Sequence, residues 1–188
     1  MEFITYTSNI DSNFLLQNNI FVSPQSRVSD GVKLYFGAKV YGESRIYGGV
    51  ELHSNAEISD SIIGKNSKVF ASIIKDSEIG DSCIIKPFVH IINSEMGANS
   101  VVGNFSCINN SCIGQNAQIN CLTTLNQLDA GNRVVIQSGV CCEADNDDTV
   151  SIGDNVVLGA NSTIIKPVII GDNTKIKPNT VVNKDVGV

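Results

Sequence analysis

Tryptophan is absent from this chain of 188 residues, aromatic residues make up only 6% of it, and there are four prolines. Hydrophobic residues nevertheless account for 42% of the sequence. A core built with so few rings must be filled mainly by Ile, Val and Leu. Because β-branched side chains favour strands, this composition predicts an all-β fold.

The sequence also lacks a long apolar run and an excess of positive charge. No run approaches the ~18 apolar residues that a membrane-spanning helix needs. The opening MEFITYTSNI does not have the order of a signal peptide. Acidic residues outnumber basic ones by 19 to 13, for a formal net charge of −6, which argues against a nucleic-acid partner. We therefore expect a cytoplasmic protein of one domain, with neither membrane nor nucleic acid as its partner.

Zinc-binding patterns are missing as well. The chain has six cysteines, and their spacings match no arrangement of zinc ligands. Without an export signal, disulfides are not expected. The sequence predicts that these cysteines act as small buried hydrophobic residues: Cys83, Cys107, Cys112, Cys121, Cys141 and Cys142.

What the chain does have is an aliphatic residue at every sixth position. One series runs Val22, Val28, Leu34, Val40, Ile46, Leu52 and Ile58, and a second runs Ile152, Leu158, Ile164, Ile170, Ile176 and Val182. Between them the rhythm is six, six, five, marked by pairs 17 residues apart: Ile79-Gly80, Met96-Gly97, Ile113-Gly114 and Ala130-Gly131. A fixed period of this kind indicates a solenoid.

The spacing fits a triangular coil of three short strands, each with one inward aliphatic residue and a Gly or Asn at the turn. Stacked as parallel strands about 4.8 Å apart, residues 22–188 predict roughly nine coils. Residues 1–21 do not keep the six-residue step, and we expect them to cap or flank the first coil. An acidic insertion at 143–151, containing Glu143, Asp145, Asp147 and Asp148, breaks the step. It is either a solvated turn or a binding loop.

The hexads IGDNVVLGANSTII and VIIGDNTKIKPNTVV resemble those of the hexapeptide-repeat acyltransferase superfamily. The resemblance implies a left-handed parallel β-helix that forms a homotrimer. It also implies acetyl-CoA or another acyl-CoA as donor, and a sugar or sugar nucleotide as acceptor. The related zinc carbonic anhydrases need three histidines per metal site, and this chain has two, so no metal is expected.

The second half resembles the acetyltransferase domain of bacterial enzymes that acetylate glucosamine 1-phosphate and then uridylylate the product. The shared signposts are Gly103-Asn104-Phe105, Ile152-Gly153-Asp154-Asn155 and Lys184-Asp185-Val186. By this resemblance the general-base histidine of those enzymes falls on Cys121 and a tyrosine falls on Thr124. An arginine of their sugar-phosphate site falls near His90, and a lysine falls within residues 107–110, where the chain has no cation.

Acyl transfer needs a base near neutral pKa, for which histidine is the usual residue. His90 is the candidate base, with Glu78 or Glu95 to orient its ring, and a surface residue is the alternative. His53 is the weaker choice. Cys121 is a second catalytic candidate, although no cation lies near it in sequence to activate its thiol.

The resemblance places the donor along the last coils. Its candidate contacts are Ser138, Ala160 and Pro178, with Lys166 and Lys177 available to phosphates, unless these lysines are merely exposed at corners. Two hypotheses follow. The first is an acyl-CoA-dependent acyltransferase acting on a sugar or sugar nucleotide. The second is a catalytically silent β-helix that serves as a scaffold or partner-binding subunit.

Overall fold

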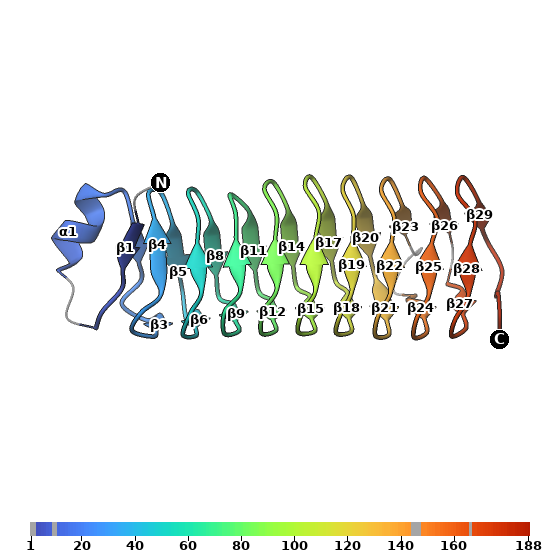
Figure 1. Cartoon of the computed structure of the whole chain (residues 1–188), viewed down its shortest axis with the longest axis horizontal. Helices are drawn as coiled ribbons and strands as arrows, with labels where there is room; N and C mark the ends of the chain where they lie inside the picture. Colours follow the sequence, from blue (N-terminus) through green and yellow to red (C-terminus); the bar gives the residue numbers. More distant parts are fainter. Residues whose placement is uncertain (1–2, 9–10, 144–147, 166) are drawn as a thin grey trace.

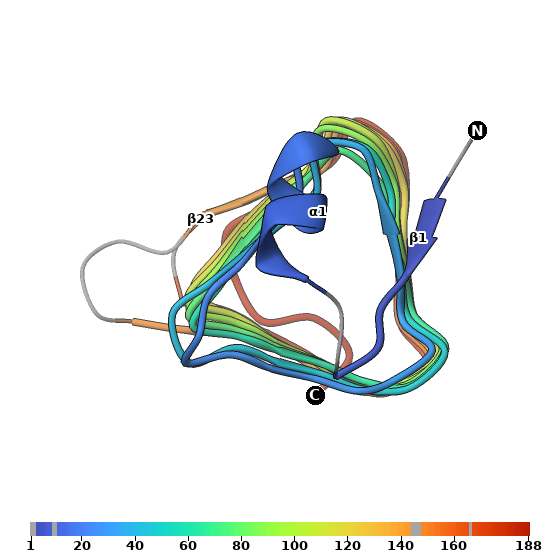
Figure 2. The ribbon, with the colours of Figure 1, turned by 90° about the vertical axis from the view of Figure 1, so that its left-hand side faces the viewer.

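The predicted left-handed parallel β-helix is confirmed, with about nine stacked coils. The structure, a computed structural model, describes residues 3–8, 11–143, 148–165 and 167–188. The coils follow one another along the long axis from the N-terminal to the C-terminal end (Figure 1). Seen down that axis they superpose as a triangle (Figure 2).

Three parallel sheets form the sides of the triangle. Among the described residues, sheet A contains ten strands, in the order β1 (Phe3–Thr5), β4 (Lys33–Tyr35), β7 (Glu51–Leu52), β10 (Lys68–Val69), β13 (Ile84–Ile85), β16 (Val101–Val102), β19 (Gln118–Ile119), β22 (Val135–Ile136), β25 (Val157–Leu158) and β28 (Lys175–Ile176). Sheet B likewise contains β2 (Phe21–Val22), β5 (Lys39–Tyr41), β8 (Glu57–Ser59), β11 (Ile73–Lys75), β14 (His90–Ile92), β17 (Cys107–Asn109), β20 (Thr124–Asn126), β23 (Cys141–Glu143), β26 (Thr163–Ile165) and β29 (Val181–Val182). Sheet C contains β3 (Arg27–Val28), β6 (Arg45–Ile46), β9 (Ile62–Ile63), β12 (Glu78–Ile79), β15 (Glu95–Met96), β18 (Cys112–Ile113), β21 (Leu128–Ala130), β24 (Val150–Ile152) and β27 (Ile169–Ile170).

The six-residue step corresponds to the inward position of each strand. Ile113, Ile119 and Leu125 belong to β18, β19 and β20, one on each sheet, and all three are buried. The preceding residue of each strand faces outward, because side chains alternate along a strand. Most coils therefore contribute three aliphatic side chains to one continuous core, in which Met96 and Cys142 also occupy inward positions.

The turns explain the asparagines of the repeat. Asn99, Asn116, Asn155 and Asn173 have φ between 57° and 60°, in the left-handed region that asparagine tolerates better than most residues. A short chain reversal with positive φ lets each strand end and the next sheet begin without a long loop. The corners consequently stack as regularly as the strands.

Buried serines form a second stacked column at the corner between sheets B and C. The hydroxyl of each serine accepts the backbone N–H of the next coil: Ser61 accepts from Ser77, Ser77 from Ser94, and Ser94 from Ser111, each at 3.1 Å. A buried N–H without an acceptor is costly. These hydroxyl groups thus satisfy donors that the narrow turn would leave without a partner.

The first residues differ from the repeat. Strand β1 pairs antiparallel with β4, and the helix α1 (Ser12–Gln17) lies at this end of the stack (Figure 1). The side chain of Asp11 caps α1 by accepting the N–H of Asn13 at 2.9 Å. Leu15 and Ile20 belong to the core. No helix of the described segments is both long and apolar enough to span a bilayer.

The acidic insertion lies between β23 and β24. The segments that flank it leave the triangular outline (Figure 2). Asp145 and Asp147, which the sequence places in this insertion, lie outside the described residues. Glu143 ends β23, and Asp148 lies two residues before β24 begins at Val150.

Candidate functional site

Four of the predicted site residues lie in one column along the A–B corner, where the chain passes from sheet A to sheet B. Backbone hydrogen bonds fix their stacking. The N–H of Gly139 donates to Cys121 O at 3.1 Å, that of Asn161 to Ser138 O at 3.0 Å, and that of Asn179 to Ala160 O at 2.8 Å. Cys121, Ser138, Ala160 and Pro178 therefore succeed one another coil by coil. We call these four residues the corner column.

A hollow of about 310 Å³ lies beside Cys121 over the outer face of sheet A. Its lining is about half polar and includes Lys86, which is exposed and lies two coils earlier. The side chains of Asn116, Gln118 and Asn120 add amide groups. The hollow thus brings a positive charge to the same space as the Cys121 thiol.

Gly103 supports this corner from below. A Cβ at Gly103 would lie 2.6 Å from the backbone C of Asn120 and 2.6 Å from the backbone N of Cys121. Real side chains do not make such contacts, so glycine permits the close stacking of the two coils. The resemblance noted for Gly103-Asn104-Phe105 therefore has a steric basis at the candidate site.

Lys177 lies at the far end of the corner column. It lines a hollow of about 300 Å³ on the last coil together with Lys175 and Lys184. The rest of the lining is largely apolar, and three lysines beside one hollow favour a ligand that carries negative charge. Lys166, the other predicted phosphate contact, lies outside the described residues.

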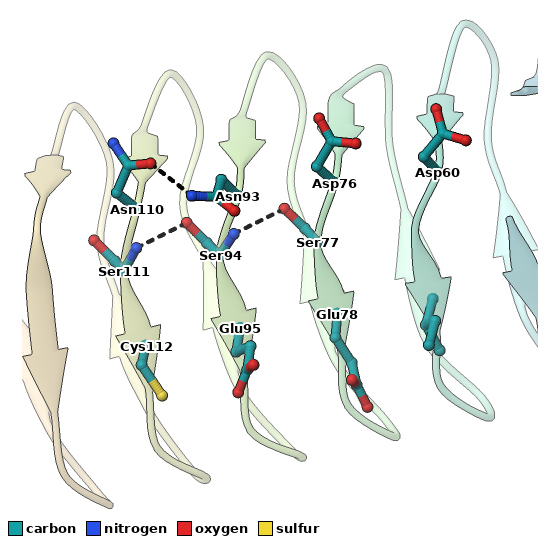
Figure 3. A pocket seen from close by; sticks show the side chains of 11 residues that line it. Asp60, Asp76, Ser77, Glu78, Asn93, Ser94, Glu95, Asn110, Ser111 and Cys112 are labelled. Atoms are coloured by element: carbon teal, nitrogen blue, oxygen red, sulfur yellow. Dashed lines mark hydrogen bonds between the residues drawn. The ribbon is translucent and has the colours of Figure 1, made fainter. Parts of the chain in front are cut away.

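His90 is not part of the corner column. It is exposed on the flat outer face of sheet B, in a row with Cys107 and Thr124 of the next two coils. Two strand spacings separate it from Thr124, about 10 Å. The predicted carboxylate partners are wrong, because Glu78 and Glu95 extend from sheet C on another side of the triangle (Figure 3).

His53 has a structural environment. Its ring lies between Tyr35 and Phe70, with centroids 4.3 Å and 3.9 Å away, and its Nε2 is 3.3 Å from Glu51 Oε2. Burial lowers the pKa of His53, although the Glu51 carboxylate opposes this shift. The carboxylate of Glu51 is also held by the ammonium groups of Lys33 and Lys68, at 3.1 Å and 3.5 Å. The stacked imidazole stabilises the fold rather than facing a ligand.

Known proteins contain the same repeat. Residues 149–184 match the family described as bacterial transferase hexapeptide (six repeats). The bifunctional protein GlmU of Buchnera aphidicola subsp. Acyrthosiphon pisum (strain Tuc7) is 33% identical over 134 residues, which cover 69% of this chain and 29% of that protein. GlmU of Synechococcus elongatus is 30% identical over 191 residues, which cover 95% of this chain and 34% of that protein. This chain belongs to the hexapeptide-repeat acyltransferase superfamily.

The hexapeptide-repeat chain spans about a third of the length of these curated relatives. Among solved structures, the UDP-N-acetylglucosamine acyltransferase of Francisella novicida aligns with a TM-score of 0.69 and 18% identity, over 76% of this chain and 59% of that one. At this identity the match shows a common fold. It identifies neither the substrate nor the donor.

The cysteines of this hexapeptide-repeat protein follow their place on the strands. Cys83 and Cys142 are buried as predicted, and burial raises the pKa of Cys142 to about 12. Cys112 is exposed, and the prediction is wrong for it, because it occupies an outward strand position. Burial and the nearby Asp129 and Glu95 carboxylates raise its pKa. All six are free thiols, and the described residues contain no group of three or more potential metal ligands.

Sequence reasoning missed one residue near the site and one unpaired atom of another. Lys86 precedes Cys121 by 35 positions, yet a step of 17 from Lys86 reaches Gly103 and then Asn120. Counting by whole coils would have found it. The second is Asn109, whose buried Oδ1 accepts no hydrogen bond from any described residue. The sequence placed Asn109 within residues 107–110, where a cation is missing, but it gives no sign that this outward side chain leaves its oxygen without a donor among the described residues.

Proposed function

We propose that this protein is an acyl-CoA-dependent acyltransferase that transfers an acetyl group to a sugar or a sugar nucleotide in the cytoplasm. The corner column carries the proposal. Its residues lie in four successive coils, three strand spacings or about 14 Å, from Cys121 to Pro178 beside the lysine-lined hollow. This is an extended path with a cationic end, suited to a long thioester whose phosphates lie far from its acyl group.

The acceptor is proposed to bind across the A–B corner onto sheet B. There His90 presents an exposed imidazole, and the Oδ1 of Asn109 on the next coil lacks a donor. In this proposal the acyl end of the donor extends past Cys121 along the corner to the level of His90, two coils earlier. The acceptor hydroxyl or amine attacks the thioester carbonyl there and gives its proton to His90, while the CoA thiolate leaves as the C–S bond breaks. A second acceptor hydroxyl donates to Asn109 and fixes the ring.

Assembly as a homotrimer is part of the proposal. Phe88, Phe105 and Leu122 form an apolar ridge at the A–B corner, with 57%, 59% and 65% of their surface exposed. All three have positive φ, between 59° and 64°, a conformation that disfavours bulky side chains. Burial of the ridge by neighbouring copies would offset this strain. It would also close a cleft over Cys121, which directly precedes Leu122.

Thiol release from acetyl-CoA, measured against a panel of amino sugars and sugar nucleotides, tests the activity. We expect release that depends on one acceptor. His90→Asn should lower kcat at least tenfold, and Asn109→Ala should raise KM for the acceptor. Cys121→Ser should retain most of the rate. If His90→Asn keeps full activity while Cys121→Ser loses it, the base is assigned to the wrong residue.

Donor binding is tested separately by titrating CoA. Lys177→Ala should weaken binding several-fold, whereas Lys65→Ala, an exposed lysine at another corner, should leave it unchanged. Absence of CoA binding at millimolar concentration contradicts the transferase proposal.

A catalytically silent scaffold is the second candidate, and one observation favours it: a thiol occupies the place where the resembled enzymes keep their base. Trimer formation without thiol release for any acceptor is the outcome that this candidate predicts. Light scattering on the same samples supplies the oligomeric state. A monomer would contradict the proposed inter-subunit cleft.

A further inference from the structure

One outward row of sheet C carries its charges in an ordered series. Parallel pairing places Arg27 beside Arg45, Arg45 beside Ile62, Ile62 beside Glu78, and Glu78 beside Glu95. All five side chains occupy the outward position of two-residue strands. The row therefore reads basic, basic, apolar, acidic, acidic over four strand spacings, about 19 Å. We call it the charge row.

These charges lie exposed and without an ion-pair partner in the described part of the chain. Among the described residues, no ion pair involves Arg27, Arg45, Glu78 or Glu95, and all four side chains are exposed. The two arginines repel each other on neighbouring strands, as do the two glutamates. Such an arrangement disfavours the isolated chain, and opposite charges from outside would relieve it.

Each half of the charge row lines its own depression. Arg27, Arg45 and Tyr47 line a hollow of about 280 Å³. Ile62, Glu78 and Glu95 line an open groove of about 670 Å³, in which the two glutamates extend from successive strands on the same side (Figure 3). The face thus offers a basic depression next to an acidic one.

We propose that a second copy of this chain docks antiparallel on sheet C, related by a two-fold axis at the level of Ile62. This axis lies in the plane of sheet C and runs perpendicular to the long axis of the β-helix. Rotation about it reverses the order of the coils in the second copy. Each outward row of one copy then faces the same row of the other. Arg27 then faces Glu95 of the second copy, Arg45 faces its Glu78, and Ile62 faces Ile62. The interface contains four opposite-charge pairs around an apolar centre.

The adjacent row allows the two faces to approach. It continues from Ser29 through Tyr47, Gly64 and Gly80 to Gly97, as the backbone hydrogen bonds between coils show. Tyr47 is 42% exposed and is the bulky member of this segment. The same axis sets Tyr47 opposite Gly80 and Gly64 opposite itself. The protruding ring therefore meets a position without a side chain.

Orientation follows from the charges. A parallel copy in the same register would set Arg27 on Arg27 and Glu95 on Glu95, which like-charge repulsion disfavours.

Asp60, at the level of the axis, lies on the B–C corner rather than in the charge row. Its carboxylate already accepts the N–H of Glu43 at 3.0 Å and the hydroxyl of Ser59 at 2.9 Å. A cation bound in the acidic groove would leave the two arginines uncompensated.

Charge reversal tests the pairing. The variant Arg27→Glu/Arg45→Glu makes the row wholly acidic, and Glu78→Arg/Glu95→Arg makes it wholly basic. Sedimentation velocity of each variant alone should show self-association at least tenfold weaker than that of the unsubstituted chain. An equimolar mixture should associate again, because every pair is then opposite in charge. Raising the salt concentration should weaken both the native and the mixed association.

Two results would overturn the proposal: variants that associate as strongly as the unsubstituted chain, or a mixture that associates no better than its components. Circular dichroism and urea midpoints establish that the variants fold. The corner ridge lies on another side of the triangle, so association through Phe88, Phe105 and Leu122 should not respond to these reversals.

Cross-linking checks the position of the axis. In a Cys112→Ser background, Ile62→Cys should form a disulfide-linked dimer on mild oxidation, since the axis sets this position opposite itself. Ile169→Cys, in the same outward row but near the far end of sheet C, is the matched control and should not. Equal cross-linking at both positions contradicts the antiparallel arrangement.

Discussion

The imidazole of His53 stacks on the ring of Phe70 with centroids 3.9 Å apart and an interplanar angle of 16°. Tyr35 covers the other face of the imidazole. Residues 35, 53 and 70 belong to three successive coils, so the stack links the coils along the outer edge of sheet A. It ties the stability of these coils to the protonation of one ring.

Protonation of His53 is predicted to destabilise the fold. Burial lowers its pKa in the folded state from the ordinary 6.5, so the unfolded chain binds the proton more readily. Stability should be complete above pH 6.5 and fall as the pH drops from there towards 5. Urea midpoints measured between pH 8 and 5 should show this decline.

Two variants isolate the contribution of His53. His53→Phe retains a stacked ring without a titrating group and should flatten the profile. His90→Gln removes the exposed histidine and should leave the decline in place. An unchanged profile in His53→Phe would assign the pH dependence to other groups.

Removal of one hydroxyl from the stacked column of buried serines should lower the free energy of unfolding. Ser94 Oγ accepts the N–H of Ser111 at 3.1 Å and donates to Ile92 O at 2.8 Å. Ser94→Ala leaves that buried N–H without an acceptor, which costs about 1–3 kcal/mol. Ser151→Ala, at an outward position of sheet C, is the control and should change the unfolding free energy by less. Similar losses for both variants would contradict the role of the column.

Gly103→Ala is predicted to destabilise the chain by about 1–3 kcal/mol, because its Cβ would force apart two stacked coils. The same clash should displace Cys121 and change the rate at which its thiol is alkylated, as followed by mass spectrometry. Gly48→Ala is the matched control: nothing lies within 4 Å of its added Cβ, and its φ is not in the left-handed region. It should have little effect on either measurement.

Leu122→Asn should stabilise the single chain and weaken the trimer. Asparagine tolerates the φ of 60° found at Leu122, so the unfolding free energy of the monomer should rise by about 1 kcal/mol. Loss of the apolar side chain should weaken trimerisation. The reverse change, Asn179→Leu at the same corner, should destabilise the monomer by a similar amount. Denaturation at low concentration and light scattering at high concentration separate the two effects.

The sequence by itself determined the solenoid, the approximate number of coils and the inward residues. Ile113, Ile119 and Leu125 could be assigned because the inward positions must be filled by apolar side chains, nearly all of them aliphatic, and this makes the period visible in the sequence. The corner column was accessible for the same reason: Cys121 and Ser138 differ by one coil of 17 residues.

Only the tertiary structure decided which outward residues meet. Row neighbours are 18 residues apart from Lys33 to Glu51, 17 from Glu51 to Lys68 and 22 from Val135 to Val157, because the corners differ in length. Outward positions are exposed to water and can hold many residue types, so they show no repeating pattern in the sequence. For this reason the sequence misplaced the partners of His90. The order of charges on sheet C became visible only once the coils were stacked.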